Sequence, residues 1–165
     1  MTLRRATLDD ADAVWRIFRA VVTGGDTYVF GPDTSREVAC EYFLSAETTC
    51  WVAEHDERIV GMYKMIPNRP DLGSHVANAS FMVDPAAQGH GAGRAMGTHC
   101  LREARRAGYR AMQFNFVVST NAPAVALWKE LGFQIVGTLP KAFRHARLGY
   151  VDAYVMHRFL DDIEG

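Results

Sequence analysis

A glycine-rich loop lies near the middle of the chain, between an apolar stretch and a helical pattern. Residues 83–96 read VDPAAQGHGAGRAM and contain Gly89, Gly91 and Gly93. Glycine adopts positive φ without a Cβ penalty and lets the backbone approach a ligand closely. Unpaired N–H groups at the start of a helix attract phosphate oxygens, and the helix dipole adds to that attraction. The stretch therefore predicts a strand–loop–helix unit that holds a phosphate or pyrophosphate.

Two common phosphate-binding motifs do not fit this spacing. A Walker loop, GxxxxGK[ST], needs a Lys-Ser or Lys-Thr pair, which is missing after these glycines. A GxGxxG fingerprint fails as well, because its last position is not glycine when counted from either Gly89 or Gly91. The pattern that fits is Gln88-x-x-Gly91-x-Gly93 after a Val-x-Pro strand end. A turn that only joins strand to helix is the alternative interpretation.

A second motif follows over residues 121–133, which read NAPAVALWKELGF. It resembles the signature N-x-x-A-x-x-L-Y-x-x-x-G-F, and the two motifs together resemble those of the GCN5-related N-acetyltransferase (GNAT) superfamily. The resemblance implies one domain over residues 1–165, with acetyl-CoA as cosubstrate. The coenzyme-binding residues that the resemblance implies are Val83, Gln88, Gly89, His90, Gly91, Ala92, Gly93, Arg94 and Asn121. For Arg94, a solvated side chain is the alternative to a phosphate contact.

Two asparagines, Asn78 and Asn115, lie inside apolar strand patterns. Asparagine is depleted in strands, and a buried carboxamide without partners costs about 1–3 kcal/mol. A bond to neighbouring backbone, or a solvated face, is the alternative explanation. In the GNAT fold these two strands separate around the acetyl group. Together with Asn121 in the setting FNFVVSTN, the pair resembles the proline-analogue (azetidine-2-carboxylate) N-acetyltransferases, which implies that both asparagines grip a small amino-acid-like acceptor and that Asn121 bonds the coenzyme.

The implied reaction is direct transfer, in which a neutral amine attacks the thioester and a thiolate leaves. We expect a backbone N–H of the fourth strand near Met82 to stabilise the developing oxyanion. Many relatives use a tyrosine as general acid, but the matching residue here is Trp128, whose indole N–H only donates. A thiol with a pKa of about 8.5 can leave without that acid. Trp128 is then a core or pocket-wall residue.

The acceptor side is predicted less sharply. Tyr28 and Phe30, in an aromatic loop, are candidates for substrate contact, and two aromatics that plug the core under the loop are the alternative. His145 is a further candidate for this pocket, although a histidine in a surface loop is the alternative. The base is Tyr28, His145, Asp152 or a water held by the asparagines.

Hydrophobic periodicity predicts a mixed α+β order of elements. The resemblance implies more: a mixed, mostly antiparallel central sheet flanked by helices, with its fourth and fifth strands splayed. The predicted strands cover residues 2–7, 49–54, 58–67, 75–83, 110–118, 133–137 and 150–159. The predicted helices cover residues 8–22, 33–43, 92–107 and 123–131.

Composition limits the classes of partner. The chain has 165 residues, is 48% hydrophobic and 22% charged, and carries a net charge of -1, which suits a single soluble domain. The sequence has no basic run that would indicate nucleic acid as a partner. It also has no apolar segment long enough to indicate a membrane span. The cysteines follow no CxxC spacing, which favours reduced thiols in the cytoplasm. No histidine lies in an HExxH or similar pattern, so we expect no metal.

Two other functions stay open. One is an acetyltransferase for another amine, such as a polyamine, an aminoglycoside antibiotic or a protein N-terminus, although no acidic patch favours polycations. The other is a non-catalytic domain that binds acyl-CoA as a sensor, which Trp128 would favour. A homodimer follows from the resemblance alone, because no residue pattern indicates one.

Overall fold

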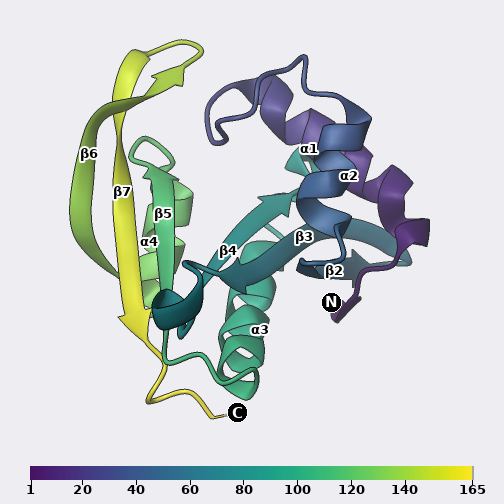
Figure 1. Cartoon of the computed structure of the whole chain (residues 1–165). Helices are drawn as coiled ribbons and strands as arrows, with labels where there is room; N and C mark the ends of the chain where they lie inside the picture. The colour runs from purple at the N-terminus through teal and green to yellow at the C-terminus, as the bar shows by residue number, and fades with distance from the viewer. Residues whose placement is uncertain (165) are drawn as a thin grey trace.

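Seven strands form one sheet, with α-helices packed against it (Figure 1). This computed structural model describes residues 1–164, and no helix among them is long and apolar enough to cross a membrane. The sheet order is β1-β2-β3-β4-β5-β7-β6. The strands are β1 (Thr2–Arg5), β2 (Thr49–His55), β3 (Arg58–Pro67), β4 (Val76–Val83), β5 (Ala111–Val118), β6 (Gln134–His145) and β7 (Gly149–Phe159). The helices are α1 (Ala11–Gly24), α2 (Arg36–Leu44), α3 (Ala92–Arg106) and α4 (Ala122–Glu130).

Strands β4 and β5 form the parallel pair of this otherwise antiparallel sheet. Their ladder holds for two residue pairs, Val76 with Ala111 and Ala77 with Met112, and the strands then diverge (Figure 1). The pairing of β5 with β7 also contains an irregularity. Such a bulge bends a strand and increases its twist, so β5 turns away from β4. The expected α+β sheet with splayed fourth and fifth strands is confirmed.

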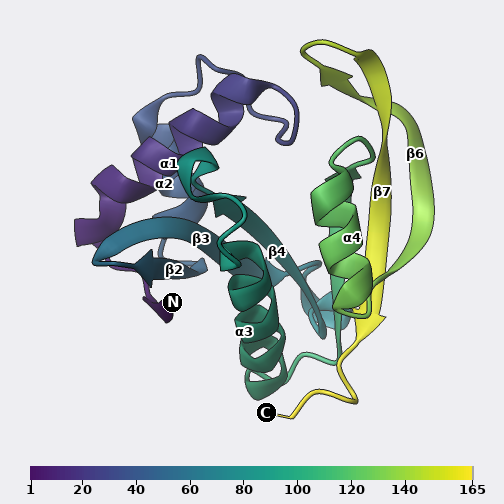
Figure 2. The same cartoon turned by 180° about the vertical axis from the view of Figure 1, so that it is seen from behind.

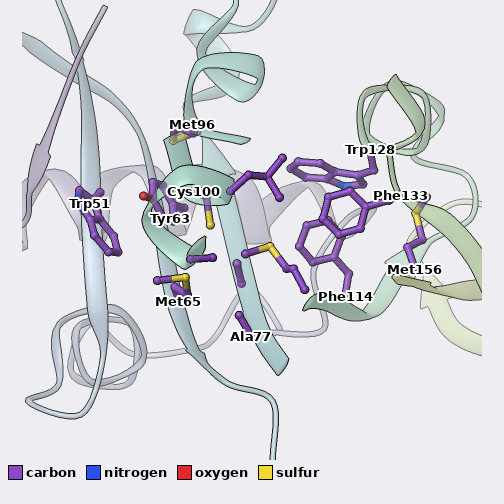
Figure 3. Packing of buried hydrophobic residues seen from close by; sticks show 14 of the residues in the cluster. Trp51, Tyr63, Met65, Ala77, Met96, Cys100, Phe114, Trp128, Phe133 and Met156 are labelled. Carbon is purple, nitrogen blue, oxygen red and sulfur yellow. The ribbon is translucent and has the colours of Figure 1, made fainter. Parts of the chain in front are cut away.

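The sheet separates two apolar cores, because successive side chains of a strand point to opposite faces. Helices α1 and α2 cover one face, whereas α3 and α4 cover the other (Figure 2). On β3, Met62 belongs to the α1–α2 core and its neighbour Tyr63 belongs to the α3–α4 core. Figure 3 shows part of the α3–α4 core, where Phe114 of β5 packs on Trp128 of α4.

Local signals explain where most elements begin and end. Asp56 and Glu57 have φ of 49° and 60°, as a type I′ hairpin turn requires, and they join the two strands that the sequence predicts at residues 49–54 and 58–67. Helix α2 starts at Arg36, later than expected, because Ser35 caps it by accepting the N–H of Val38 at 3.4 Å. Strand β6 extends far beyond the predicted residues 133–137. The prediction was too short because most side chains of β6 are exposed and leave no alternating pattern in the sequence.

Candidate active site

A cleft of about 310 Å³ opens where β4 and β5 separate. Its lining comes from both faces of the sheet, because the loop after α1 and helix α2 contribute on one side and helix α4 on the other. We call these the α2 wall (Tyr28, Tyr42, Asn78 and Ser80) and the α4 wall (Phe81, Phe114 and Trp128). Of the site residues predicted from sequence, the structure brings to this cleft Tyr28, Asn78, Asn115 and Asn121.

The direction of the backbone alternates along β4. The N–H of Asp84 donates to the carbonyl of Val60 at 2.8 Å, and the register pairs Met82 with Met62. The even-numbered positions of β4 therefore bond to β3. Met82 directs its own N–H toward β3, and its side chain is only 2% exposed, in the α1–α2 core. Its backbone consequently does not face the cleft, whereas that of its neighbour Phe81 does.

Phe81 and Val83 are the residues beside Met82 whose amide groups point away from β3. The hydroxyl of Tyr28 donates to the carbonyl of Phe81 at 2.8 Å, which agrees with this direction. Because β5 has already diverged, these amides face the gap between the strands instead of a neighbouring strand. The register of β4 with β3 shows which amides face the gap, and the residue types alone could not show this.

Asn78 lies one residue beyond the last β4–β5 ladder pair, at the point where the strands separate. Its Nδ2 donates to the backbone carbonyl of Gln113 on β5 at 2.8 Å. The side chain thus continues the pairing of the two strands for one more step and lines the cleft at the same time. This explains physically why a polar residue occurs inside an apolar strand pattern.

Asn115 is held by two other carboxamides. Its Nδ2 donates to Oδ1 of Asn68 at 2.7 Å, and its Oδ1 accepts from Nε2 of Gln113 at 2.9 Å. Asn68 directly follows β3, just beyond the strand that the sequence predicts at residues 58–67. The chain of three carboxamides orients Asn115 beside the cleft, and sequence analysis missed both partners because they are distant in the chain or hidden in a strand.

Two tyrosine hydroxyls define the α2 wall. Tyr42 and Ser80 share a hydrogen bond of 2.7 Å between their hydroxyl oxygens. Burial raises the pKa of Tyr28 well above its ordinary value and also raises the pKa of Tyr42. Both phenols therefore keep their protons at neutral pH, and neither is suited to be the base. Tyr42 was missed in the sequence because an aromatic on an amphipathic helix reads as core.

Phe30 and His145 do not line the cleft. The Phe30 ring lies 5.2 Å from that of Phe18 and 4.9 Å from that of Tyr42, so this aromatic plugs the core under the loop. His145 is buried near the β6–β7 turn, where its Nδ1 accepts the backbone N–H of Arg147 at 3.1 Å. The structure thus supports the core alternative for Phe30, and it places His145 buried at the end of β6 and not in a surface loop.

The other candidate base, Asp152, lies on β7. Its carboxylate accepts the backbone N–H of Lys141 at 2.9 Å and so stabilises the β6–β7 hairpin. It is not among the residues that line the cleft. Within residues 1–164, no group of three or more histidine, cysteine, aspartate or glutamate side chains is placed to hold a metal ion.

Trp128 forms most of the α4 wall. Its ring lies 4.8 Å from that of Phe81, centroid to centroid. It lies 4.7 Å from the ring of Phe114, which Figure 3 shows beside it. The side chain is 8% exposed, which agrees with a pocket-wall residue. Gly97 of α3 permits this packing, because a Cβ there would lie 3.1 Å from the indole. The edge of the tryptophan therefore limits how far the cleft extends between the strands.

The glycine-rich loop is anchored by Asp84 at the end of β4. Its carboxylate accepts the N–H of Ala86 at 3.0 Å and pairs with Arg16 of α1 and with Arg58 of β3. Burial alone would raise the pKa of this carboxyl group, but the Ala86 N–H and the two guanidinium groups hold the pKa below its usual range. The start of the loop is consequently fixed to both α1 and β3.

The loop then turns into α3 through left-handed glycines. Gly89 and Gly91 have φ of 81° and 80°, a region that L side chains rarely adopt. The first backbone bond of α3 runs from the N–H of Ala95 to the carbonyl of Gly91 at 3.0 Å. The N–H groups of Ala92 and Gly93 precede that bond and have no partner within the helix. This geometry fits a phosphate group at the helix start.

Side chains around this loop are engaged with protein groups. Arg94 forms an ion pair with Glu130 of α4, which ties the two helices together. Nδ1 of His90 lies 3.0 Å from the carbonyl oxygen of Gln88, so the ring folds back onto its own loop. Gln88 and His90 are both exposed.

Asn121 caps helix α4 at the edge of the cleft. Its Oδ1 accepts the N–H of Ala124 at 3.4 Å, as an N-cap residue does. Because the oxygen is used in the cap, the amide nitrogen is the group left to donate to a ligand. The residue therefore has a structural role that is sufficient by itself to explain its place in the second motif.

Residues 13–133, which contain the strands of the cleft, the glycine-rich loop and helix α4, match the acetyltransferase (GNAT) family. The chain belongs to this family. It is 42% identical to a GCN5-related N-acetyltransferase from Kribbella flavida, whose structure it matches with a TM-score of 0.91 over 96% of each chain.

Two further relatives add context. The N-acetyltransferase aca1 of Schizosaccharomyces pombe is 34% identical over 107 residues, which are 64% of this chain and 51% of the relative. This chain thus spans about half the length of that protein. A phosphinothricin acetyltransferase from Sinorhizobium meliloti, solved in complex with acetyl-CoA, matches with a TM-score of 0.81 at 23% identity, over 96% of this chain and 87% of that one. At this identity the match concerns the fold alone.

Proposed function

We propose that the protein transfers the acetyl group of acetyl-CoA to the amine of a small molecule, with a proline-like amino acid as acceptor. One observation carries the proposal. The β4–β5 ladder ends after two residue pairs, and backbone amides of β4 then face a cleft lined with neutral polar side chains. Family membership and the printed activity of the Schizosaccharomyces pombe relative support N-acetyl transfer.

The coenzyme has a place along one side of this cleft. In the proposal, its pyrophosphate lies against the backbone N–H groups of residues 88–94, at the start of α3. Its pantetheine arm follows β4, where Val83 and Phe81 present amide groups toward the gap that β5 leaves. The free amide nitrogen of Asn121 donates to the same arm from the α4 side.

The transfer itself joins the amine nitrogen to the acetyl carbon as the carbon–sulfur bond breaks. The amide N–H of Phe81 or Val83 donates to the carbonyl oxygen as it gains negative charge. The sulfur leaves as thiolate, since a thiol pKa of about 8.5 allows this with water nearby. Neither Tyr28 nor Tyr42 takes the proton of the amine, because burial raises the pKa of each phenol.

The acceptor lies against the α2 wall. Asn78 and Asn115 are fixed by hydrogen bonds to Gln113 and Asn68. Each therefore holds its remaining hydrogen-bonding positions in one orientation. Carboxamides both donate and accept, and they therefore orient an amino acid without a buried ion pair. A water molecule held by the two asparagines takes the proton from the attacking amine.

Cytoplasmic location and a homodimer stay predictions.

The test is release of thiol from acetyl-CoA with a panel of amines that includes azetidine-2-carboxylate, proline, a polyamine and an aminoglycoside. We expect turnover with small cyclic amino acids. Turnover confined to other amines would keep the transferase and discard this acceptor. Coenzyme binding in calorimetry, without turnover on any amine, would replace the proposal with an acyl-CoA sensor.

A further inference from the structure

Lys64 is a buried lysine for which the proposed reaction has no use. It lies on β3 with 7% of its surface exposed. Among residues 1–164, the ion pairs involve arginine and histidine side chains and leave Lys64 out. Burial of a charge is costly unless a partner of opposite sign compensates it. A buried lysine without a carboxylate partner therefore needs a reason.

The ammonium group lies directly behind the α2 wall. Its Nζ is 3.2 Å from the centroid of the Tyr42 ring, a cation–π contact. Lys64 is also paired across the sheet with Cys50 on β2 and with Ser80 on β4. Tyr42 and Ser80, which bond to each other, both line the cleft. One aromatic ring thus separates this charge from the place where the acceptor lies.

The neighbours of Lys64 do not balance its charge. Burial raises the pKa of Cys50 to about 12 and raises the pKa of Tyr42, so both groups are neutral near pH 7. Ser80 carries no charge. Burial lowers the pKa of Lys64 itself to about 8, which still leaves most of the amine protonated at pH 7. The polar groups of the α2 wall are therefore neutral, and the positive charge of Lys64 lies behind them.

We propose that Lys64 makes this site selective for acceptors that carry a carboxylate next to the amine that is acetylated. An opposite charge across a partly buried gap attracts the carboxylate, and the attraction is stronger than in water because the local dielectric is lower. The inference rests on the proposed acetyl transfer. Lys64 acts through space past Tyr42 and touches no reacting atom, so its role is in specificity and not in catalysis.

The experiment compares matched acceptors in wild type, Lys64→Met and Lys141→Met. Each pair consists of an amino acid and its primary amide, with proline and prolinamide as the first pair and other small amino acids after it. Methionine is close in shape to lysine and removes the buried charge, so the variant should fold. Lys141 is exposed on β6 and controls for the loss of one positive charge. The measured quantity is the ratio of kcat/KM for acid over amide.

We expect wild type and Lys141→Met to favour the acids, and the ratio to fall about tenfold in Lys64→Met, which corresponds to about 1.4 kcal/mol. The preference of wild type should also decline as the pH rises through about 8, since Lys64 loses its charge there. Lys64→Gln, with the same loss of charge, should behave as Lys64→Met does. A matching fall in melting temperature without a change in the ratio would mean that Lys64 is structural only and would overturn the inference.

Failure of the inference and failure of the proposed function have different results. If the protein releases thiol with simple amines but with none of the amino acids, the transferase stands and the role of Lys64 is wrong. An unchanged acid-to-amide ratio in Lys64→Met has the same meaning. If no amine at all supports thiol release, the proposed function fails, and the inference fails with it.

Discussion

The two sides of the cleft are built in different ways. The side that we propose for the coenzyme presents mostly backbone groups: the amides of Phe81 and Val83, the loop of residues 88–91 and the start of α3. The side that we propose for the acceptor presents side chains from separate elements, among them Tyr42 of α2 and Asn115 of β5, with Lys64 of β3 behind Tyr42. A backbone site tolerates many sequences as long as the local conformation forms, whereas a side-chain site changes with each substitution.

This difference suggests how specificity is divided. The acyl donor would be common to the family, and a site made of peptide groups suits a ligand that does not change. In our proposal the acceptor instead meets side chains, each of which a single substitution can change. Substitutions on the two sides should therefore separate turnover from coenzyme affinity, and the predictions below test this separation.

The largest effect is expected from the asparagine pair. Asn78→Ala and Asn115→Ala should each reduce turnover roughly 100-fold, because each removes an acceptor contact and leaves a polar partner unsatisfied at about 1–3 kcal/mol. Coenzyme affinity, measured by calorimetry, should change by less than about twofold, which is well under 1 kcal/mol. Normal turnover in both variants would refute the assignment of the acceptor side.

A smaller effect, on coenzyme affinity instead of turnover, is expected from the glycine-rich loop. Gly91→Val should weaken acetyl-CoA binding roughly 30-fold, because a β-branched residue at positive φ costs on the order of 1–3 kcal/mol and φ at Gly91 is 80°. Gly31→Val is the matched control, since a Cβ there meets nothing within 4 Å and φ is not positive. Equal coenzyme affinity in both variants would mean that the loop does not hold the phosphates.

The smallest effect should come from Asn121, where the two sides meet. Asn121→Ala should lower the free energy of unfolding by about 1 kcal/mol through loss of the cap. Asn121→Ser keeps a capping oxygen and should retain stability, but it should weaken coenzyme binding a few-fold because the amide donor is gone. Chemical denaturation and calorimetry measure the two quantities. Full coenzyme affinity in Asn121→Ser would reduce this residue to a helix cap.

Much of the fold could be predicted because its signals are local. The two strands of the β2–β3 hairpin, the glycine-rich loop and helix α3 each depend on a few adjacent residues, whereas the cap of α4 by Asn121 was not predicted. The extent of β6 could not be predicted, since an edge strand with exposed faces lacks the alternating pattern that reveals a buried strand. The start of α2 was misplaced by a few residues because several polar residues precede it and could cap it.

The candidate site divides in the same way. Asn78 and Asn115 were recognisable as polar residues inside apolar strands, and both line the cleft. Phe30 had the same local appearance as Tyr28, yet only Tyr28 reaches the cleft, because the course of the loop decides which aromatic faces inward. Met82 was one position away from the amides that face the gap, since the register with β3 sets the direction of each N–H.

The sequence by itself determined the glycine loop, the helix that follows it and the order of the elements. These depend on neighbours in the chain, whose propensities act before any distant contact forms. Only the tertiary structure decided that Tyr42 lines the cleft, that Lys64 lies behind its ring and that Asn68 holds Asn115. Such contacts join residues from different strands and helices, and their geometry follows from the twist and register of the whole sheet.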